Sequence, residues 1–328
     1  MSCQNNLSFA IVGTNFISDR FVEAAKKCPG ISIYAVYSRK NETGRAFADK
    51  HGIPCVYTDY DEMLDDCNIQ AVYVASPTFM HCEHSVKALE AGKHVLCEKM
   101  ISVTYDEFLK MKDTAMRKGL VLLEAMRQDH DPATAIIKEY TSKLGAVRRA
   151  TLEYCQYSSR YDSFKNGVVL NAFDPKLKNS ALADIGIYPL HTAIDLFGEP
   201  KEIYSKSVFL NNGFEGEGSV ILAYSDKVVT VIYSKITDSV NPSVVEGEHG
   251  SLTFDKINAP SSIVFYPRKE EKIMLDYSPI ENNMVYEIRA FYDMIYNAKK
   301  YESYLETTEI TMKCVEKIYA TSGIDFGE

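Results

Sequence analysis

Several features that mark other protein classes are missing from this sequence of 328 residues. No apolar run approaches the ~18 residues of a membrane span, and the stretch 7–12 near the N-terminus is too short, and interrupted by Ser8, for a secretory leader. Basic residues are outnumbered, 36 Lys+Arg against 45 Asp+Glu, and the net charge of -9 disfavours binding to nucleic acid or to an anionic membrane. We therefore expect a cytoplasmic protein without nucleic-acid or membrane partners.

Cysteine pairs are also missing. The eight cysteines include no C-x-x-C pair and lack the close spacing of a secreted disulfide scaffold, so we expect reduced thiols. The cluster His81-Cys82-Glu83-His84 holds candidate ligands, but no second pair at zinc spacing accompanies it, and we predict no metal site. A G-x-S-x-G elbow is absent as well, which argues against a serine hydrolase.

The first third of the chain alternates short apolar runs with helical patterns, which is typical of parallel βαβ units. The predicted strands are 7–12, 31–37, 71–75, 94–97 and 121–124, and the predicted helices are 16–27, 42–51, 80–91 and 105–118. We predict a doubly wound parallel sheet of the dinucleotide-binding Rossmann type over residues 1–128.

After about residue 130 the pattern changes to extended runs separated by turn residues, which is typical of an antiparallel sheet. These runs are 147–157, 203–210, 219–224, 228–236, 244–245, 251–254, 263–266 and 273–275, and helical patterns at 284–299 and 307–319 follow them. We predict a second, α+β domain over residues 129–328, with a large, predominantly antiparallel open sheet. Because few helices follow this sheet, one face should be buried against a second copy, in a homodimer or a dimer of dimers.

The turn after the first predicted strand carries the first sign of a cofactor. It reads Gly13-Thr14-Asn15-Phe16-Ile17-Ser18, which keeps only the first glycine of the G-x-G-x-x-G fingerprint. Asn tolerates positive φ better than most residues, and Ser is small enough for close helix–strand packing. The following helix would offer its N-terminal amides to a pyrophosphate. An ordinary strand-to-helix turn remains the alternative.

The second sign lies at the end of the second predicted strand, where an NAD site would carry Asp or Glu for the ribose 2′-hydroxyl. The sequence has Ser38-Arg39 there. A hydroxyl and a guanidinium suit a 2′-phosphate, and no carboxylate repels it. NADP is favoured over NAD, although a solvated loop would have the same composition.

Two later strand ends should meet at the same crevice, because ligands in open α/β sheets bind beyond the carboxyl ends of the strands. One carries Ser76-Pro77-Thr78 and His81, and the other carries Glu98-Lys99-Met100. The chain contains the segments AIVGTNFIS, AVYSR, VASPTFMH, ALEAGKHVLCEK, LEAMRQDHDPA and ALADIGIYPLHTAIDLFG. In this combination it resembles the Gfo/Idh/MocA oxidoreductases, the family of glucose-fructose oxidoreductase and inositol dehydrogenase, over essentially its whole length.

The resemblance implies roles for individual residues. The family's Glu-Lys-Pro motif falls on Glu98-Lys99-Met100, which places Lys99 near the nicotinamide ribose and the substrate hydroxyl. Met100 departs from the motif and removes the backbone constraint of proline. Together with the strand-end positions described above, this resemblance gives as candidate cofactor-binding residues the Gly13–Ile17 turn, Ser38, Arg39, Ser76, Pro77, Thr78, His81, Glu98 and Lys99.

A second motif follows in the later domain, where many family members carry an Asp and, four residues on, a His. Here the residues are Asp184 and Tyr188, which resembles the branch of glucose-fructose oxidoreductase and dimeric dihydrodiol dehydrogenase, in which a tyrosine is the proposed acid/base. On a regular helix Asp184, Tyr188 and His191 would share one face, but Pro189 would kink it. Tyr188 as a packed core aromatic and His191 as a structural partner remain open alternatives.

These observations predict an NADP-preferring oxidoreductase that moves a hydride between the nicotinamide and a hydroxyl or carbonyl carbon of a sugar, polyol or related molecule. Carbonyl reduction needs a positioned acid, for which Tyr188 is the candidate, with Lys99 favouring the phenolate and Asp184 orienting the pair. Candidate substrate residues are Arg127, His130, Arg160, Tyr161, Asp162, Asp184, Tyr188 and His191. Two alternatives stay open: a non-catalytic NADP-sensing regulator, because fold alone does not give turnover, and a dihydrodiol or dicarbonyl reductase.

Overall fold

The computed structural model describes residues 6–297 and 301–326. Backbone contacts divide the chain into two compact units: Met1–Arg127 with Glu281–Leu305, and Gln128–Ile280 with Glu306–Glu328. The sequence placed all of 129–328 in one domain, whereas the structure groups 281–305 with the first unit. The physical reason is apolar packing, since Phe291 from the later segment lies 5.7 Å from the Phe9 ring and is fully buried.

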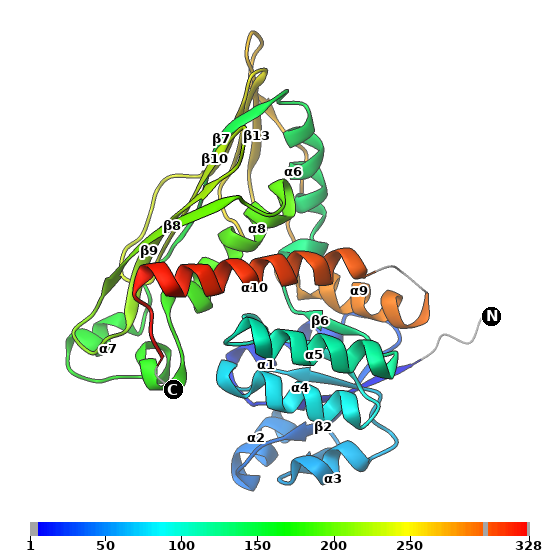
Figure 1. Cartoon of the computed structure of the whole chain (residues 1–328). Coiled ribbons are helices and arrows are strands. Elements are labelled where there is room, and N and C mark those ends of the chain that lie inside the picture. Colours follow the sequence, from blue (N-terminus) through cyan, green and yellow to red (C-terminus); the bar gives the residue numbers. More distant parts are fainter. Residues whose placement is uncertain (1–5, 298–300, 327–328) are drawn as a thin grey trace. The chain divides into compact units, whose positions relative to one another are not determined.

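The first unit is built on a six-stranded sheet in the order β3-β2-β1-β4-β5-β6 with every pair parallel. Two of its strands, β2 and β6, are labelled in Figure 1. The strands are β1 (Leu7–Val12), β2 (Ile31–Tyr37), β3 (Cys55–Tyr57), β4 (Ala71–Val74), β5 (His94–Cys97) and β6 (Leu122–Glu124). The order reverses between β1 and β4, and ligands bind at such a switch point in doubly wound sheets. The predicted fold class is confirmed for this unit.

Helices cover this sheet because their apolar residues recur at helical spacing and their ends are capped. They are α1 (Phe16–Ala25), α2 (Asn41–His51), α3 (Tyr60–Asp65), α4 (His81–Glu90), α5 (Tyr105–Lys118) and α9 (Met284–Tyr296). Thr104 and Glu107 form a capping box at the start of α5, which satisfies two otherwise unpaired amides. The short elements β3 and α3 were not predicted, because three and six residues carry too little periodicity to be distinguished from a loop.

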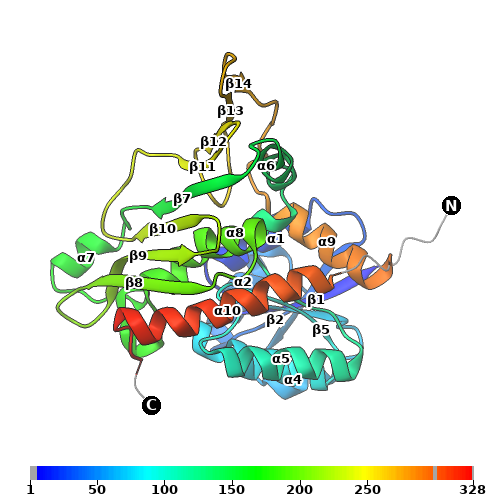
Figure 2. The ribbon, with the colours of Figure 1, turned by 45° about the horizontal axis from the view of Figure 1, so that its top comes forward.

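The second unit contains an eight-stranded sheet in the order β14-β13-β12-β11-β7-β10-β9-β8 (Figure 2). Its strands are β7 (Val147–Cys155), β8 (Glu202–Phe209), β9 (Glu215–Ala223), β10 (Val228–Ser234), β11 (Ser243–Gly247), β12 (Gly250–Phe254), β13 (Ile263–Pro267) and β14 (Ile273–Met274). All neighbours are antiparallel except β7 and β10, which run parallel. The predicted large, predominantly antiparallel sheet is confirmed.

The helices of this unit are α6 (Pro132–Ser142), α7 (Tyr161–Lys165), α8 (Ile187–Phe197) and α10 (Glu302–Ser322) from Glu306 onward, with a π-helical turn, η5 (Leu182–Gly186), directly before α8. Burial alternates along the strands: Val220 and Leu222 are fully buried, while Ile221 between them is 43% exposed. One face of the sheet therefore packs against helices, and the opposite face, called here the outer face, carries exposed apolar side chains.

Two further observations concern the described residues. None of their helices is long and apolar enough to cross a membrane. Their seven cysteines are all free thiols, and Cys3 lies outside the described residues.

Candidate active site

The turn after β1 forms a tight cradle at the switch point of the first sheet. Gly13 has φ +107°, and a Cβ on it would lie 2.6 Å from the carbonyl oxygen of Ala75, at the end of β4. Only glycine fits such a close approach of two backbones at this φ. The backbone geometry therefore requires glycine at position 13, the first glycine of the fingerprint.

Asn15 acts differently from the sequence expectation. Its φ is -90°, so positive φ plays no part, and its side chain caps α1 instead. The Asn15 Oδ1 accepts from the Ser18 amide at 3.2 Å, and its Nδ2 donates to the Ala75 carbonyl at 2.9 Å. Ser18 is fully buried, in keeping with close helix–strand packing. The amides of Phe16 and Ile17, in the first turn of α1, have no intrahelical acceptor and can serve an anion.

The end of β2 offers a cationic rim. Arg39 is exposed and Ser38 is half-buried, and no acidic side chain replaces them at this strand end. The nearby strand end of β4 is ordered by histidines. The His84 Nδ1 lies 2.9 Å from the Ser76 hydroxyl, and burial lowers the pKa of His84 to about 4, which keeps the ring neutral at pH 7.

His81 links two strand ends from the start of α4. Its Nε2 lies 2.8 Å from the Ser76 carbonyl oxygen and its Nδ1 lies 2.9 Å from the Met100 carbonyl oxygen. Burial lowers the pKa of His81 to about 4, so the ring is neutral and donates to one of the two carbonyls. His81 therefore connects the loop after β4, which contains Pro77 and Thr78, with the loop after β5, which contains Lys99.

The Glu98-Lys99-Met100 segment sits at the end of β5 on a buried support. The Glu98 carboxylate accepts from the Tyr73 hydroxyl at 2.5 Å and from the Lys99 amide at 3.2 Å. Burial raises the pKa of Glu98, and the charge of Lys99 opposes that rise. Met100 is fully buried, and Glu124 accepts from the next amide, that of Ile101, at 3.0 Å. Lys99 itself is half-buried and projects from a segment held on both sides.

In the second unit, Asp184 and Tyr188 lie on one continuous helical segment with η5 at its start. Proline at position 189 has no amide to donate, and the wider π turn before it changes the helical phase. The prediction that Asp184, Tyr188 and His191 share one face assumed the spacing of a regular α-helix, and this segment does not have that spacing. Asp184 is half-exposed and pairs with Lys235, at 2.9 Å between Oδ2 and Nζ.

Tyr188 is 7% exposed, and its ring meets the Tyr154 ring edge-on at 5.7 Å between centroids. The turn that carries it is pressed onto the sheet. A Cβ on Gly186 would lie 2.6 Å from the ring of Tyr233, and Glu215 accepts from the Leu182 amide at 2.8 Å. Glu215 also accepts from the Tyr233 hydroxyl, so the N-terminal end of the segment is anchored on β9 and β10.

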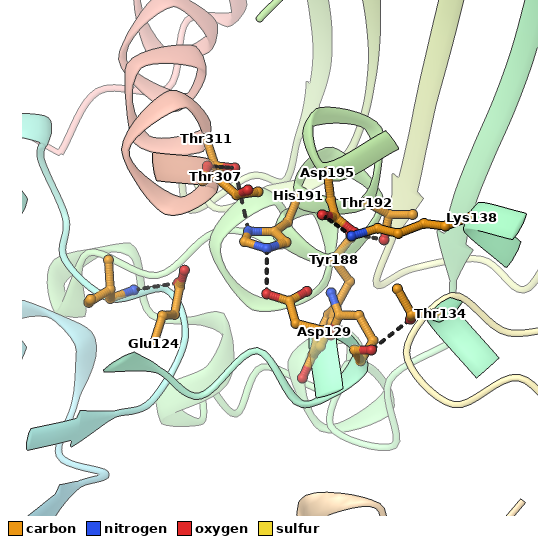
Figure 3. Close-up of polar contacts among 12 residues, drawn as sticks. Glu124, Asp129, Thr134, Lys138, Tyr188, His191, Thr192, Asp195, Thr307 and Thr311 are labelled. Atoms are coloured by element: carbon orange, nitrogen blue, oxygen red, sulfur yellow. Dashed lines mark hydrogen bonds and ion pairs between the residues drawn. The ribbon is translucent and has the colours of Figure 1, made fainter. Parts of the chain in front are cut away.

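His191 is fully buried and points to Asp129, with 2.8 Å between Nε2 and Oδ2 (Figure 3). Its Nδ1 lies 3.4 Å from the Thr311 hydroxyl, which itself donates to the Thr307 carbonyl. Next to this group, Asp195 pairs with Lys138 at 2.6 Å, and burial raises the pKa of Asp195, with the charge of Asp129 adding to that rise. These contacts give His191 a place in a buried polar network.

The remaining candidates occupy two segments of the chain. Arg127 and His130 are half-buried in the 3-10 turn Arg127–His130. Arg160 is exposed just before α7, while the Tyr161 ring stacks on Phe173 at 5.7 Å. Asp162 is exposed and pairs with Lys165.

Sequence reasoning missed three groups that support these residues. Asp129 holds His191, Glu215 anchors η5, and Lys235 holds Asp184. Asp129 could have been noticed inside the LEAMRQDHDPA segment. Nothing in the local sequence marks Lys235 or Glu215, because both act across strands that only the fold brings together.

The chain is similar to known proteins over nearly its whole length. Residues 7–126 match the model of an oxidoreductase family with an NAD-binding Rossmann fold, GFO_IDH_MocA, and residues 139–253 match the GFO/IDH/MocA C-terminal domain. The chain is 38% identical to scyllo-inositol 2-dehydrogenase (NADP(+)) IolU of Bacillus subtilis, over 97% of this chain and 98% of that protein.

Two further matches extend this result. The chain is 33% identical to the uncharacterized oxidoreductase YgjR of Escherichia coli, over 98% of both proteins. Its fold is similar to that of KijD10, a 3-ketoreductase from Actinomadura kijaniata solved with NADP and TDP-benzene. The TM-score is 0.86 and the identity is 20%, over 97% of this chain and 98% of that one.

Proposed function

The chain belongs to the Gfo/Idh/MocA oxidoreductase family and is an NAD(P)-dependent oxidoreductase; from this premise we propose that it oxidises a ring hydroxyl of a cyclitol or a related polyol with NADP, and catalyses the reverse reduction. The observation that carries the choice of substrate class is the full-length similarity to an enzyme named as an NADP-dependent inositol dehydrogenase.

The residues at the switch point fit the cofactor. The Gly13 cradle leaves no room for a Cβ, and the first amides of α1 face outward from a capped helix start, as a pyrophosphate requires. Ser38 and Arg39 suit the 2′-phosphate of NADP, and in this proposal Thr14, Ser76, Pro77 and Thr78, which follow β1 and β4, also contact the cofactor. When bound, NADP accepts the hydride at its nicotinamide ring.

In the proposed oxidation, a side chain of the protein takes up the proton of the substrate hydroxyl. We assign the proton of the substrate hydroxyl to Tyr188, whose buried ring limits exchange with bulk water. Lys99 would stabilise the phenolate by its charge, and Asp184 would orient the substrate hydroxyls. Its contact with Asp129 makes His191 a positioning residue in this proposal rather than the proton donor.

The substrate itself is recognised by polar side chains. Arg127 and Arg160 can donate to several hydroxyl oxygens at once, and the hydroxyl of Tyr161, whose ring is held in the stack with Phe164 and Phe173, can donate to one more. These three residues, with Asp184, form the proposed substrate set.

The activity test is NADP⁺ reduction, followed at the nicotinamide absorbance, against a panel of inositols, aldoses and acyclic polyols. We expect turnover with at least one cyclitol and none with buffer alone. Tyr34→Phe is the matched control for Tyr188→Phe, because Tyr34 is a half-buried tyrosine on β2 that belongs to none of the proposed catalytic, cofactor-binding or interface residues. Absence of turnover across the panel in both reaction directions would reject the proposal.

We also propose a homodimer, or a dimer of dimers, built on the outer face. Cross-strand neighbours form one row across this face: Tyr204, Ile221, Thr230, Thr151, Val244, Thr253, Val264 and Met274. Tyr204 is 56% exposed and Met274 is 61% exposed, which is costly for side chains of this size unless a partner covers them. Sedimentation at micromolar protein should give at least twice the 37.0 kDa chain mass, and a monomer would reject this proposal.

We place the enzyme in the cytoplasm. The free state of all seven described cysteines supports a reducing compartment.

A further inference from the structure

Lys235 is a buried cation directly after β10, with three kinds of partner. Its side chain is 4% exposed, and its Nζ lies 2.9 Å from the Asp184 Oδ2 and donates to the Ala172 carbonyl at 2.8 Å. The ammonium also lies over the rings of Phe173 and Phe214, at 4.8 and 5.1 Å from their centroids. A buried lysine is retained only where charge and hydrogen bonds compensate its desolvation, so this arrangement is specific.

The Ala172 contact ties down a long connection between β7 and η5, called here the 158–179 loop. The same lysine also accepts, through its backbone carbonyl, from the Ser158 amide at 2.9 Å, so it contacts the loop at its first residue and again at Ala172. Inside the loop the rings of Tyr161, Phe164 and Phe173 stack on one another at 5.7–6.1 Å. The loop contains the proposed substrate residues Arg160 and Tyr161.

The Asp184 contact ties down the other side. The backbone around Asp184 is already fixed, because Glu215 anchors Leu182 and Gly186 is pressed on Tyr233. Those contacts hold the backbone only. The half-exposed side-chain carboxylate of Asp184 is held by its ion pair with Lys235. Lys235 thus joins the loop to the carboxylate that precedes Tyr188 by one turn.

We propose that Lys235 is a positioning residue that couples the 158–179 loop to Asp184 and thereby sets the affinity for the polyol. This inference rests on the proposed function, in which both elements hold the substrate. Lys235 acts through Asp184 and the loop, so its loss should weaken substrate binding more than the hydride step.

Lys235→Met is the informative change, because methionine keeps most of the apolar contact with Phe173 and Phe214 and removes the charge. Asp184 is half-exposed and can be hydrated in the variant, so the fold should survive. We expect KM for the polyol to rise by about tenfold to a hundredfold, with a much smaller change in kcat and an unchanged Kd for NADPH. Lys235→Arg keeps the charge and should restore part of the lost affinity.

Lys227→Met is the matched control. Lys227 lies at the opposite end of β10, pairs with Asp226 and lies over the rings of Phe197 and Tyr224, so it reproduces the chemistry away from the loop. It should leave KM unchanged. An equal rise in KM in both lysine variants, or no rise in Lys235→Met, would overturn the proposal.

Amide hydrogen exchange separates this inference from the proposed function, because it needs no substrate. In Lys235→Met the peptides covering 158–184 should exchange faster than in the wild type, while those covering 7–37 should not change. Unchanged exchange in 158–184 would overturn the coupling even if the enzyme is active. Faster exchange in a protein that turns over no polyol would reject the proposed substrate class and retain the coupling between loop and Asp184.

Discussion

Replacing Gly13 by alanine should weaken cofactor binding more than the addition of a methyl group at any other position of the first unit. Gly13 has φ +107°, and the new Cβ would lie 2.6 Å from the Ala75 carbonyl oxygen and 3.0 Å from its carbon. Both atoms belong to the backbone, so neither can rotate away. The ends of β1 and β4 would have to separate.

The cost can be estimated from two contributions. Positive φ costs an alanine about 1–2 kcal/mol relative to glycine. Separation of the strand ends would also break the bond from Asn15 Nδ2 to the Ala75 carbonyl, at about 1 kcal/mol. We expect a loss of about 2–3 kcal/mol in unfolding free energy and at least about a tenfold loss of NADPH affinity.

Gly52→Ala provides the comparison. Gly52 has φ +74°, but nothing lies within 4 Å of its added Cβ, so only the backbone contribution of about 1–2 kcal/mol applies. Urea denaturation gives the stabilities, and nicotinamide fluorescence titration gives the affinities. If Gly13→Ala binds NADPH as tightly as Gly52→Ala does, the close approach at Ala75 does not shape the cofactor site.

Three further predictions follow from other residues. Ser38→Asp should reduce the preference for NADPH over NADH by about tenfold or more, because the carboxylate repels the 2′-phosphate; titration with both cofactors tests this, and an unchanged ratio would exclude Ser38 from the site. Tyr188→Phe should slow single-turnover hydride transfer by about 10²- to 10⁴-fold and leave NADPH affinity unchanged, and near-wild-type chemistry would remove Tyr188 from the mechanism. Burial lowers the pKa of His94 from its ordinary 6.5 to about 4, and its Nδ1 accepts from the Val121 amide at 3.0 Å. The unfolded state therefore binds more protons below pH 6.5, so the stability due to neutral His94 is complete above that pH and is lost as pH falls toward 4. His94→Gln should flatten the fall in urea stability between pH 7 and 5, and an equal slope would contradict this reasoning.

The sequence was sufficient for most elements whose periodicity extends over many residues, although the eleven-residue helix α6 was not predicted. All eight strands of the large sheet and the longer strands of the parallel sheet carry alternating or continuous apolar patterns, and each was predicted within a few residues. The helix at 284–299 was predicted, although residues 298–299 lie outside the described part of the chain. Its packing against the first sheet was not, because periodicity identifies a helix and says nothing about which distant surface it covers.

Candidate site residues could be proposed from the sequence only where a motif is local. Gly13 and Ser38-Arg39 follow directly from their positions after strands, whereas the role of Asn15 required the actual backbone angles, since a cap and a left-handed turn favour the same residue. The π turn at Leu182–Gly186 changed the phase between Asp184 and Tyr188, which ideal helix spacing could not reveal. Lys235 and Asp129 act across long stretches of chain, and no spacing rule connects them with the residues that they hold.

The most direct measurement of the central claim is isotope transfer. Each cyclitol of the panel is labelled with deuterium at its hydroxyl-bearing ring carbons and is incubated with NADP⁺, and any NADPH formed is analysed by mass spectrometry and proton NMR. Direct hydride transfer predicts one deuterium on the nicotinamide ring of each NADPH formed, with a slowed rate in single turnover. NADP binding without any label transfer, from any member of the panel, would contradict the claim and support a protein that senses the cofactor without using it.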